Sequence, residues 1–240
     1  MDIDQHSLRL LFAVADDPDT PAPLLEELAR SPHSAVRFKV VYNPNVTTEI
    51  LHDLARDEND PIRDAVAGHR KTTTEDLRML ALDPYPYARA SVAANPRTPI
   101  DVAEVLASDD DAVVRASAAN WADLSESTLR LLARDLDDEV RRGVAYNRRT
   151  PSSVMTDLVD DHFEGVRFYA AVNPATPPAA VIMLTRDQSS QVRRNARASA
   201  WRSPEVIMRI LRVSDLAAVE RDMRERPEVV RSALGWESES

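Results

Sequence analysis

The sequence has no cysteine among its 240 residues, which excludes disulfides, thiolate catalysis, cysteine-bound zinc and iron–sulfur clusters. It has only four glycines, against sixteen prolines: Gly68, Gly143, Gly165 and Gly235. Gly-rich phosphate loops need clustered glycines, and none of these four lie close together. Turns in this chain must therefore be made with Pro, Asn, Asp and Thr.

Long apolar runs are also missing, because no run approaches the roughly 18 residues that a membrane-spanning helix needs. The first six residues are acidic and lack the basic start of a signal peptide. Apolar residues make up 43% of the chain and charged residues 29%, which is the balance of a soluble globular protein. We therefore expect a cytoplasmic protein without membrane contact.

The net charge of −10 is unevenly distributed along the chain. Residues 1–120 carry 21 acidic and 12 basic side chains, whereas residues 121–240 carry 19 and 18. An acidic chain repels phosphate backbones at long range, so this charge disfavours general nucleic-acid binding.

A Val-Arg pair recurs every 26 residues without insertion, which marks an internal repeat. The arginine of the pair is present in all seven repeats: Arg37, Arg63, Arg89, Arg115, Arg141, Arg167 and Arg193. An aspartate precedes six of these arginines by six residues: Asp57, Asp83, Asp109, Asp135, Asp161 and Asp187. A leucine column keeps the same register, and asparagine ends several repeats, so chance alignment is excluded.

Each repeat has the pattern of two short helices. Threonine followed by proline opens the first helix in three repeats: Thr98-Pro99, Thr150-Pro151 and Thr176-Pro177. Thr72 with Glu75 fits a capping box, and the second helix opens at a small polar residue such as Asp60. Isolated helices below about 12–15 residues are marginal in water, so their apolar faces must stack on neighbouring repeats.

The predicted fold is therefore an all-α superhelical solenoid of about seven two-helix repeats with degenerate terminal caps. We expect a capping half-repeat at residues 1–18 and the repeat solenoid at residues 19–200. In the N-terminal cap, Leu10 takes the place of the repeated valine. A degenerate capping repeat follows at residues 201–234, and a polar tail at residues 235–240.

The repeat Asn-Pro-x-Thr-Pro-x-x-x-Leu-x-x-Leu-Ala-x-Asp-x-x-x-x-Val-Arg-x-x-Val-Ala-x is similar to the leucine-rich repeat variant family. Its clearest copies run from Asn95 to Ala119 and from Asn147 to Val172, and the resemblance covers about residues 17–200. The resemblance implies a right-handed superhelix of alternating α-helices and short 3₁₀-type helices. Some members carry an iron–sulfur cluster on N-terminal cysteines, which this chain lacks, so we expect no cofactor.

The regular arginine column could bind a polyanion, or it could hold the repeats together. A residue that every repeat needs usually serves every repeat, and the Asp-x5-Arg spacing also resembles HEAT repeats, which use such a pair as an internal ladder. With aspartates at matched spacing, we interpret the thirteen arginines and aspartates named above as a ladder of charge-assisted hydrogen bonds between repeats.

Catalytic and metal-binding patterns have little support in the sequence. There is no Gly-x-Ser-x-Gly motif, and the five histidines are scattered. Asp160-Asp161-His162 resembles a metal cluster, but Asp161 belongs to the aspartate column. We therefore expect neither an enzyme nor a metal site.

The variable columns are the candidates for function, because fixed columns build the scaffold. The variable columns lie one, two and five residues after the arginine. The first two repeats have Phe38, Lys39 and Tyr42, and then Asp64, Ala65 and Gly68, at these positions. The middle repeats have mainly small residues there. Late repeats gather aromatic and arginine side chains, which are enriched at interface hot spots. Our hypothesis is a partner-binding patch on the concave surface, with packing between repeats as the alternative for some members: Arg142, Tyr146, Phe168, Tyr169, Arg194 and Arg197.

Two further features carry open alternatives. Trp121 and Trp201 stand at or near the asparagine column, where we expect corner packing rather than recognition. Residues 186–212 contain seven arginines against two acidic residues. This stretch could receive an acidic protein segment or a nucleic acid, or it could be a solvated end of the array.

The favoured function is a non-catalytic scaffold that binds a partner protein or peptide, and we expect a monomer. One alternative is a HEAT-like DNA-binding protein or alkyl-base glycosylase, which would need a basic concave face with aromatics and a carboxylate at its centre. The central repeats instead offer Ala90, Ser91, Ala116 and Ser117, and the front half is acidic. Another alternative is a purely structural subunit that associates end to end.

The ladder interpretation predicts a large cost for removing one arginine. Arg115→Ala should lower the free energy of unfolding by several kcal/mol, because a partly buried carboxylate loses its partner. Thermal unfolding measures this directly, and an unchanged melting temperature would contradict the interpretation.

Overall fold

The computed structural model describes residues 5–212 and 215–236, and helices are the only regular secondary structure in these ranges. The predicted all-α repeat architecture is therefore confirmed. The chain divides into two compact parts, an N-terminal unit of residues 1–128 and a C-terminal unit of residues 129–240. The two units are described separately.

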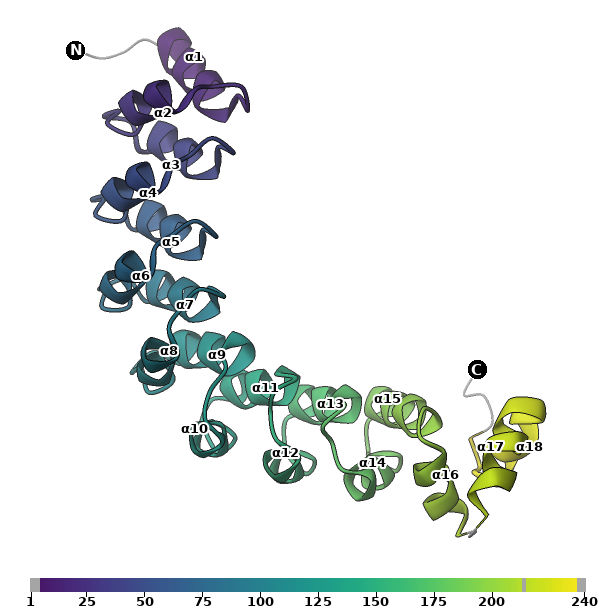
Figure 1. Cartoon of the computed structure of the whole chain (residues 1–240). Helices are drawn as coiled ribbons and strands as arrows, with labels where there is room; N and C mark the ends of the chain where they lie inside the picture. Colours follow the sequence, from purple (N-terminus) through teal and green to yellow (C-terminus); the bar gives the residue numbers. More distant parts are fainter. Residues whose placement is uncertain (1–4, 213–214, 237–240) are drawn as a thin grey trace. The chain divides into compact units, whose positions relative to one another are not determined.

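In the N-terminal unit, successive repeats place their second helices side by side in one row (Figure 1). This row consists of α1 (Gln5–Asp16), α3 (Ser34–Tyr42), α5 (Asp60–Gly68), α7 (Pro86–Ala94) and α9 (Ala112–Trp121). The first helices of the repeats contact this row from one side: α2 (Ala22–Leu28), α4 (Thr48–Leu54), α6 (Thr74–Leu80) and α8 (Ile100–Leu106). Helix α10 (Glu126–Leu132) spans the boundary of the two units.

The C-terminal unit continues the pattern with a row of second helices: α11 (Asp138–Tyr146), α13 (Glu164–Val172) and α15 (Ser190–Trp201). Their first-helix partners are α12 (Ser152–Leu158) and α14 (Pro178–Leu184). Three helices complete the chain: α16 (Pro204–Leu211), α17 (Leu216–Glu225) and α18 (Pro227–Ala233). No helix in the described residues has the length and apolar character required to cross a membrane.

The core is built from the repeated apolar columns, one layer per repeat. Val36, Ile62 and Val114 are fully buried in the N-terminal unit, as are Val140 and Val166 in the C-terminal unit. Each helix has only two to three turns and is marginal by itself, so it depends on the neighbouring helices that cover its apolar face. Stability of each repeat therefore depends on the repeats beside it.

Both helices of a repeat are α-helices, which corrects the 3₁₀-type helix that the family resemblance implied. In α4, Leu51 N–H donates to Thr47 O and Ala55 N–H donates to Leu51 O, at 3.1 and 2.8 Å, with the i→i−4 spacing of an α-helix. A tighter i→i−3 bond forms where the chain leaves α4, where Arg56 N–H donates to Asp53 O.

The predicted threonine caps are wrong in most repeats. Helix α6 is capped by Thr73, whose hydroxyl oxygen accepts from Asp76 N–H at 3.1 Å, and not by Thr72 with Glu75. In α8, α12 and α14 the proline itself occupies the N-cap position with extended backbone, and no side chain caps the helix. The proline fixes φ near the value that the chain needs to enter the helix.

The threonines before these helices have a different role, because they close the loop between the two helices. Their hydroxyls donate to the backbone carbonyl six residues earlier, inside the preceding second helix. This bond occurs in five repeats: Thr20 to Val14, Thr72 to Val66, Thr98 to Val92, Thr150 to Val144 and Thr176 to Ala170. It gives a carbonyl in the last turn of the helix an additional donor, and the carbonyls of Val14, Val66 and Val92 also accept from the backbone N–H three residues further on.

The asparagine column links each repeat to the one before it. Asn95 is 5% exposed, and its side-chain amide donates to Ala67 O at 2.7 Å and His69 O at 3.2 Å. Its carbonyl oxygen accepts from Arg97 N–H. Asn43 and Asn173 make the same three bonds. The amide is therefore fully used between repeats, and the column does more than mark the end of a repeat.

The ends of the array depart from the pattern. Leu10, which we expected in the buried valine column, is 61% exposed. At the other end α15 runs on to Trp201, and Ser199 stands in the asparagine column. An apolar cluster then joins α16, α17 and α18, and Trp236 packs against it, although we expected a polar tail from residue 235. Residues 237–240 of that tail lie outside the described residues.

The asparagine bonds predict a loss of stability on truncation. Asn95→Ala removes the side-chain donor of the buried Ala67 O and one of two donors of the partly buried His69 O, so the free energy of unfolding should fall by about 1–3 kcal/mol in urea titrations. Asn45 is a matched control, because its amide also donates to two carbonyls of the previous repeat but lies exposed to water. Asn45→Ala should cost less than about 1 kcal/mol, since water replaces the lost bonds. Equal costs would contradict the role of burial.

Candidate partner-binding site

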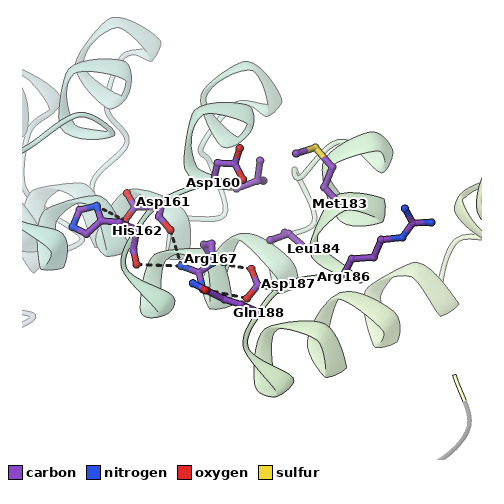
Figure 2. A pocket seen from close by; sticks show the side chains of 10 residues that line it. Asp160, Asp161, His162, Arg167, Met183, Leu184, Arg186, Asp187 and Gln188 are labelled. Atoms are coloured by element: carbon purple, nitrogen blue, oxygen red, sulfur yellow. Dashed lines mark hydrogen bonds and ion pairs between the residues drawn. The ribbon is translucent and has the colours of Figure 1, made fainter. Parts of the chain in front are cut away.

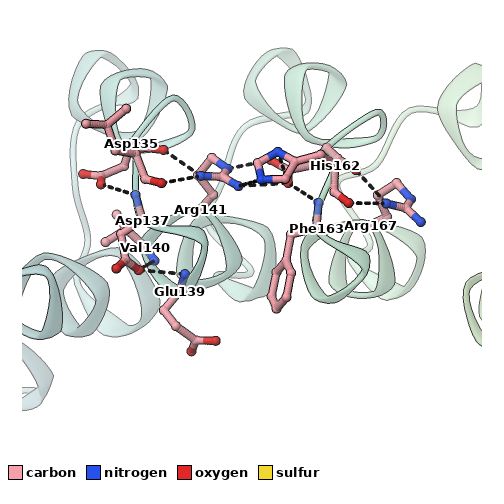
Figure 3. A network of polar contacts seen from close by, with 10 residues as sticks. Asp135, Asp137, Glu139, Val140, Arg141, His162, Phe163 and Arg167 are labelled. Atoms are coloured by element: carbon pink, nitrogen blue, oxygen red, sulfur yellow. Dashed lines mark hydrogen bonds and ion pairs between the residues drawn. The ribbon is translucent and has the colours of Figure 1, made fainter.

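Five arginines of the column form a ladder within the two units, in which each arginine is joined to the aspartate of the next repeat. Arg141 donates from Nε and Nη2 to the two carboxylate oxygens of Asp161, at 2.6 and 3.1 Å, and both side chains are 7% exposed (Figure 3). The same bidentate pair joins Arg37 to Asp57, Arg63 to Asp83, Arg89 to Asp109 and Arg167 to Asp187. Two parallel N–H···O bonds to an ionised acceptor are among the strongest hydrogen bonds in proteins.

Each arginine uses its third nitrogen within its own repeat. Nη1 of Arg141 donates to Asp135 O at 2.7 Å, and Nη1 of Arg167 donates to Asp161 O at 2.7 Å. The aspartate six residues before an arginine therefore has two roles. Its backbone carbonyl accepts from the arginine of its own repeat, and its carboxylate accepts from the arginine of the previous repeat. Arg115 and Arg193 make the same backbone bond, to Asp109 O and Asp187 O. The predicted ladder residues thus act in cohesion, and the five forked guanidinium groups are not available to a polyanion.

The carboxylates of the ladder have lowered pKa values. Burial by itself would raise the pKa of Asp161, but hydrogen bonds from the Arg141 guanidinium and the Phe163 N–H outweigh it. The balance is the same for Asp83 and Asp187. At Asp109 the hydrogen bond from Arg89 is the largest contribution and lowers the pKa against burial. These carboxylates are therefore charged in the folded protein at neutral pH.

The variable columns of the C-terminal unit bring three aromatic rings into contact. Tyr146 of α11 and Tyr169 of α13 meet edge to face, with ring centroids 5.2 Å apart and an interplanar angle of 84°. Phe168 meets Tyr169 in the same way, at 5.1 Å and 80°. Tyr146 is 45% exposed and the other two rings are half-buried. We call these three side chains the aromatic cluster.

Two of the predicted arginines stand in the same column as Phe168, one repeat before it and one after it. Arg142 on α11 forms an ion pair with Glu139, a residue that the sequence analysis did not select although the i, i+3 spacing could have indicated it. Arg194 on α15 is exposed. Arg197 is placed differently, because its guanidinium lies 5.8 Å from the centre of the Trp236 ring in the C-terminal region. The candidate site is therefore the aromatic cluster with Arg142 and Arg194.

A hollow of about 350 Å³ lies in the C-terminal unit beside the ladder residues Asp161, Arg167 and Asp187 (Figure 2). It includes Asp160, Asp161 and His162, the sequence that resembles a metal cluster. The Asp161 carboxylate is bound by Arg141, and Asp187 on the far side is bound by Arg167. Among the described residues no group of three histidine or acidic side chains could hold a metal ion.

The tryptophans and the late arginines also have defined places. Trp121 is 61% exposed, so less than half of its surface is covered by packing. Trp201 packs against the C-terminal cluster, and Arg231 lies over its ring at 5.0 Å. Within the arginine-rich stretch, Arg193 donates to backbone carbonyls and Arg197 faces Trp236, so these two point into the protein rather than to one shared surface.

Comparison with solved structures supports the fold. The chain is similar to a leucine-rich repeat variant described as having a novel repetitive protein structural motif, at 25% identity and a TM-score of 0.56 over 89% of this chain and 80% of that one. It is also similar to YibA of Escherichia coli, at 16% identity and a TM-score of 0.46, over 100% of this chain and 99% of that one. A designed armadillo repeat protein matches at 16% identity and a TM-score of 0.28, over 82% of this chain and 94% of that one. Neither the protein-family models nor the curated proteins give a match.

The helices and the likeness together define a helical repeat solenoid. Within that class the chain has the fold of the leucine-rich repeat variant, as the repeat motif predicted.

The lowered carboxylate pKa values predict acid sensitivity. A carboxylate whose pKa is lower in the folded than in the unfolded chain stabilises the fold above its unfolded pKa, near 4, and this stabilisation is lost as the pH falls through the folded value. Urea midpoints should therefore stay level between about pH 7 and pH 5 and fall below about pH 4. The Asp161→Asn variant should start less stable and lose less on acidification. An equally steep loss in this variant would contradict the contribution of the ladder.

Proposed function

We propose that this protein is a non-catalytic scaffold that binds a partner protein or peptide through the aromatic cluster and the flanking Arg142 and Arg194. The observation that carries the proposal is the contact of three partly exposed aromatic rings across two neighbouring repeats. Tyrosine and arginine side chains supply much of the binding energy at protein interfaces.

The arrangement of the rings suits binding better than packing alone. A ring that served only the core would be buried like Val140 and Val166, yet Tyr146 keeps almost half of its surface in water. Edge-to-face contacts hold the rings in place before a partner arrives. Less side-chain entropy is then lost on binding, which raises affinity.

The charges around the cluster indicate the chemistry of the partner. The C-terminal unit carries 17 acidic and 18 basic side chains, whereas the N-terminal unit carries 23 and 12. Arg142 is held by Glu139 on the same helix, an exchangeable surface pair, and Arg194 is exposed. A partner segment that combines an apolar or aromatic group with an acidic side chain could pack on the rings and pair with either arginine.

The fold supports the same role, because stacked repeats present extended surfaces whose variable positions can change without disturbing the scaffold. The DNA-binding, glycosylase and self-association alternatives lack a specific observation in their favour. Each predicts a different outcome in the experiment below.

The proposal predicts that Tyr146→Ala with Tyr169→Ala abolishes partner capture. The full-length double variant and the parent are used as baits in native lysate, and the retained proteins are compared. Helicity and melting temperature should stay close to those of the parent, because Tyr146 and Tyr169 lie at variable rather than repeated positions. Tyr87→Ala is the matched control, since Tyr87 is an exposed tyrosine of the N-terminal unit and should leave capture unchanged.

Three outcomes would overturn the proposal. Loss of helicity in the double variant would assign the rings to packing between repeats. Capture of nucleic acid that falls steeply with salt would favour the DNA-binding alternative, because phosphate contacts release counterions. Light scattering that rises with concentration and is lost in the double variant would favour self-association through this surface.

A further inference from the structure

A separate pocket of about 590 Å³ lies in the N-terminal unit, on the row formed by α3, α5 and α7. Its walls include Phe38 and Tyr42 of α3, Asp64 and Gly68 of α5, and Ser91 of α7. This volume falls within the range of protein ligand pockets. The pocket shares no residue with the aromatic cluster of the C-terminal unit.

The pocket arises from the order of large and small residues in two variable columns. Phe38 and Asp64 are equivalent positions one repeat apart, and so are Tyr42 and Gly68. The two large rings of α3 are thus followed by a residue without a side chain. A Cβ atom added at Gly68 would lie 3.9 Å from Cβ and Oγ of Ser91, so a longer side chain there would grow into the space.

One wall of the pocket is aromatic. The rings of Phe38 and Tyr42 lie on one face of α3, with centroids 5.1 Å apart and planes tilted by 56°, and Tyr42 is 60% exposed. The face of such a ring attracts a cation within about 6 Å. The rings therefore offer both apolar contact and a favourable electrostatic surface to a positively charged group.

Another part of the pocket lining carries a carboxylate, that of Asp64. Asp64 accepts a hydrogen bond of 2.5 Å from the Ser91 hydroxyl, which fixes the position of one carboxylate oxygen. An ionised carboxylate has room for further donors on its other lone pairs. A cationic group that enters between the rings and Asp64 would meet attraction from both sides.

Few neighbouring groups oppose a cation. Burial, with smaller effects of Lys71 and Arg70, lowers the pKa of His69, so this lining residue is neutral at pH 7. Lys39 on α3 is held by Asp16 at 2.8 Å. Arg70, which is exposed, is the cation among the lining residues, and the N-terminal unit as a whole is strongly acidic.

We propose that this pocket binds a lysine or arginine side chain of a partner protein segment, with the cationic head between Asp64 and the rings of Phe38 and Tyr42. The choice of a cationic occupant follows from charge complementarity with the carboxylate and the acidic unit. The C-terminal unit uses the same variable columns with arginine in place of aspartate beside its aromatic rings. The two surfaces therefore select side chains of opposite charge, and this pocket does not depend on the function proposed above.

The test is a titration of the full-length protein, followed by amide NMR shifts, with three capped pentapeptides. They have the sequence Gly-Ala-x-Ala-Gly, with lysine, norleucine or glutamate at the centre. The lysine peptide should shift the amides around Gly68 and Ser91, the norleucine peptide should bind more weakly, and the glutamate peptide should not bind.

Variants separate the contributions. Tyr42→Ala and Asp64→Asn should each weaken binding of the lysine peptide by about two- to fivefold, and Gly68→Leu should block it by filling the pocket. Arg70→Ser should strengthen binding, because it removes the competing cation. Tyr87→Ala, an exposed tyrosine of α7 that is not in the pocket lining, is the control and should change nothing.

Equal or tighter binding of the glutamate peptide would overturn the proposal, as would lysine binding that is unchanged in Asp64→Asn and Gly68→Leu. Circular dichroism of each variant establishes that the fold is retained. The Tyr146→Ala and Tyr169→Ala double variant should bind the lysine peptide like the parent. A failure of the C-terminal surface therefore cannot be mistaken for a failure of this pocket.

Discussion

The forked hydrogen bond from an arginine to the aspartate of the next repeat is the interaction on which this structure depends. Each helix is too short to be stable by itself, so a repeat persists only when its neighbours cover its apolar face. The fork fixes the distance and direction of that neighbour, because both carboxylate oxygens and a backbone carbonyl must be met by one planar group, as at Arg141. Burial of the pair makes a missing partner costly, so the register of 26 residues is strictly kept.

The asparagine and threonine columns complete this framework with different chemistry. The arginine ladder uses charge at the turn between the two helices of a repeat, whereas Asn95 uses a neutral amide at the turn between repeats. Thr150 donates to a carbonyl in the second helix of the preceding repeat. These three columns use their polar groups internally. The positions one, two and five residues after the arginine are therefore the candidates for the binding that we propose. On these positions one unit pairs aromatic rings with arginine, and the other pairs them with aspartate.

The ladder could be predicted because its geometry repeats with the sequence. A residue that recurs with a fixed period occupies equivalent environments, so the arginine and aspartate columns could be assigned to one ladder without a structure, whereas the pairing of Arg141 with Asp161 came from the structure. The departures were harder to foresee. Thr98 precedes a helix-opening proline and reads as a cap, but its hydroxyl turns back to a carbonyl that only the folded loop brings close. Leu10 and Trp121 were expected to be covered, and exposure depends on neighbours that sequence does not show.

The sequence by itself determined the repeat, its two helices, the two ladder columns and the uneven charge, because each of these follows from periodicity or composition. Only the tertiary structure decided which variable side chains meet. It joined Tyr146 to Tyr169 across two helices, turned Arg197 toward Trp236, and opened a pocket where Gly68 faces Ser91. The physical reason is that spacing fixes the column of a residue, whereas contact depends on the size and direction of the side chains beside it.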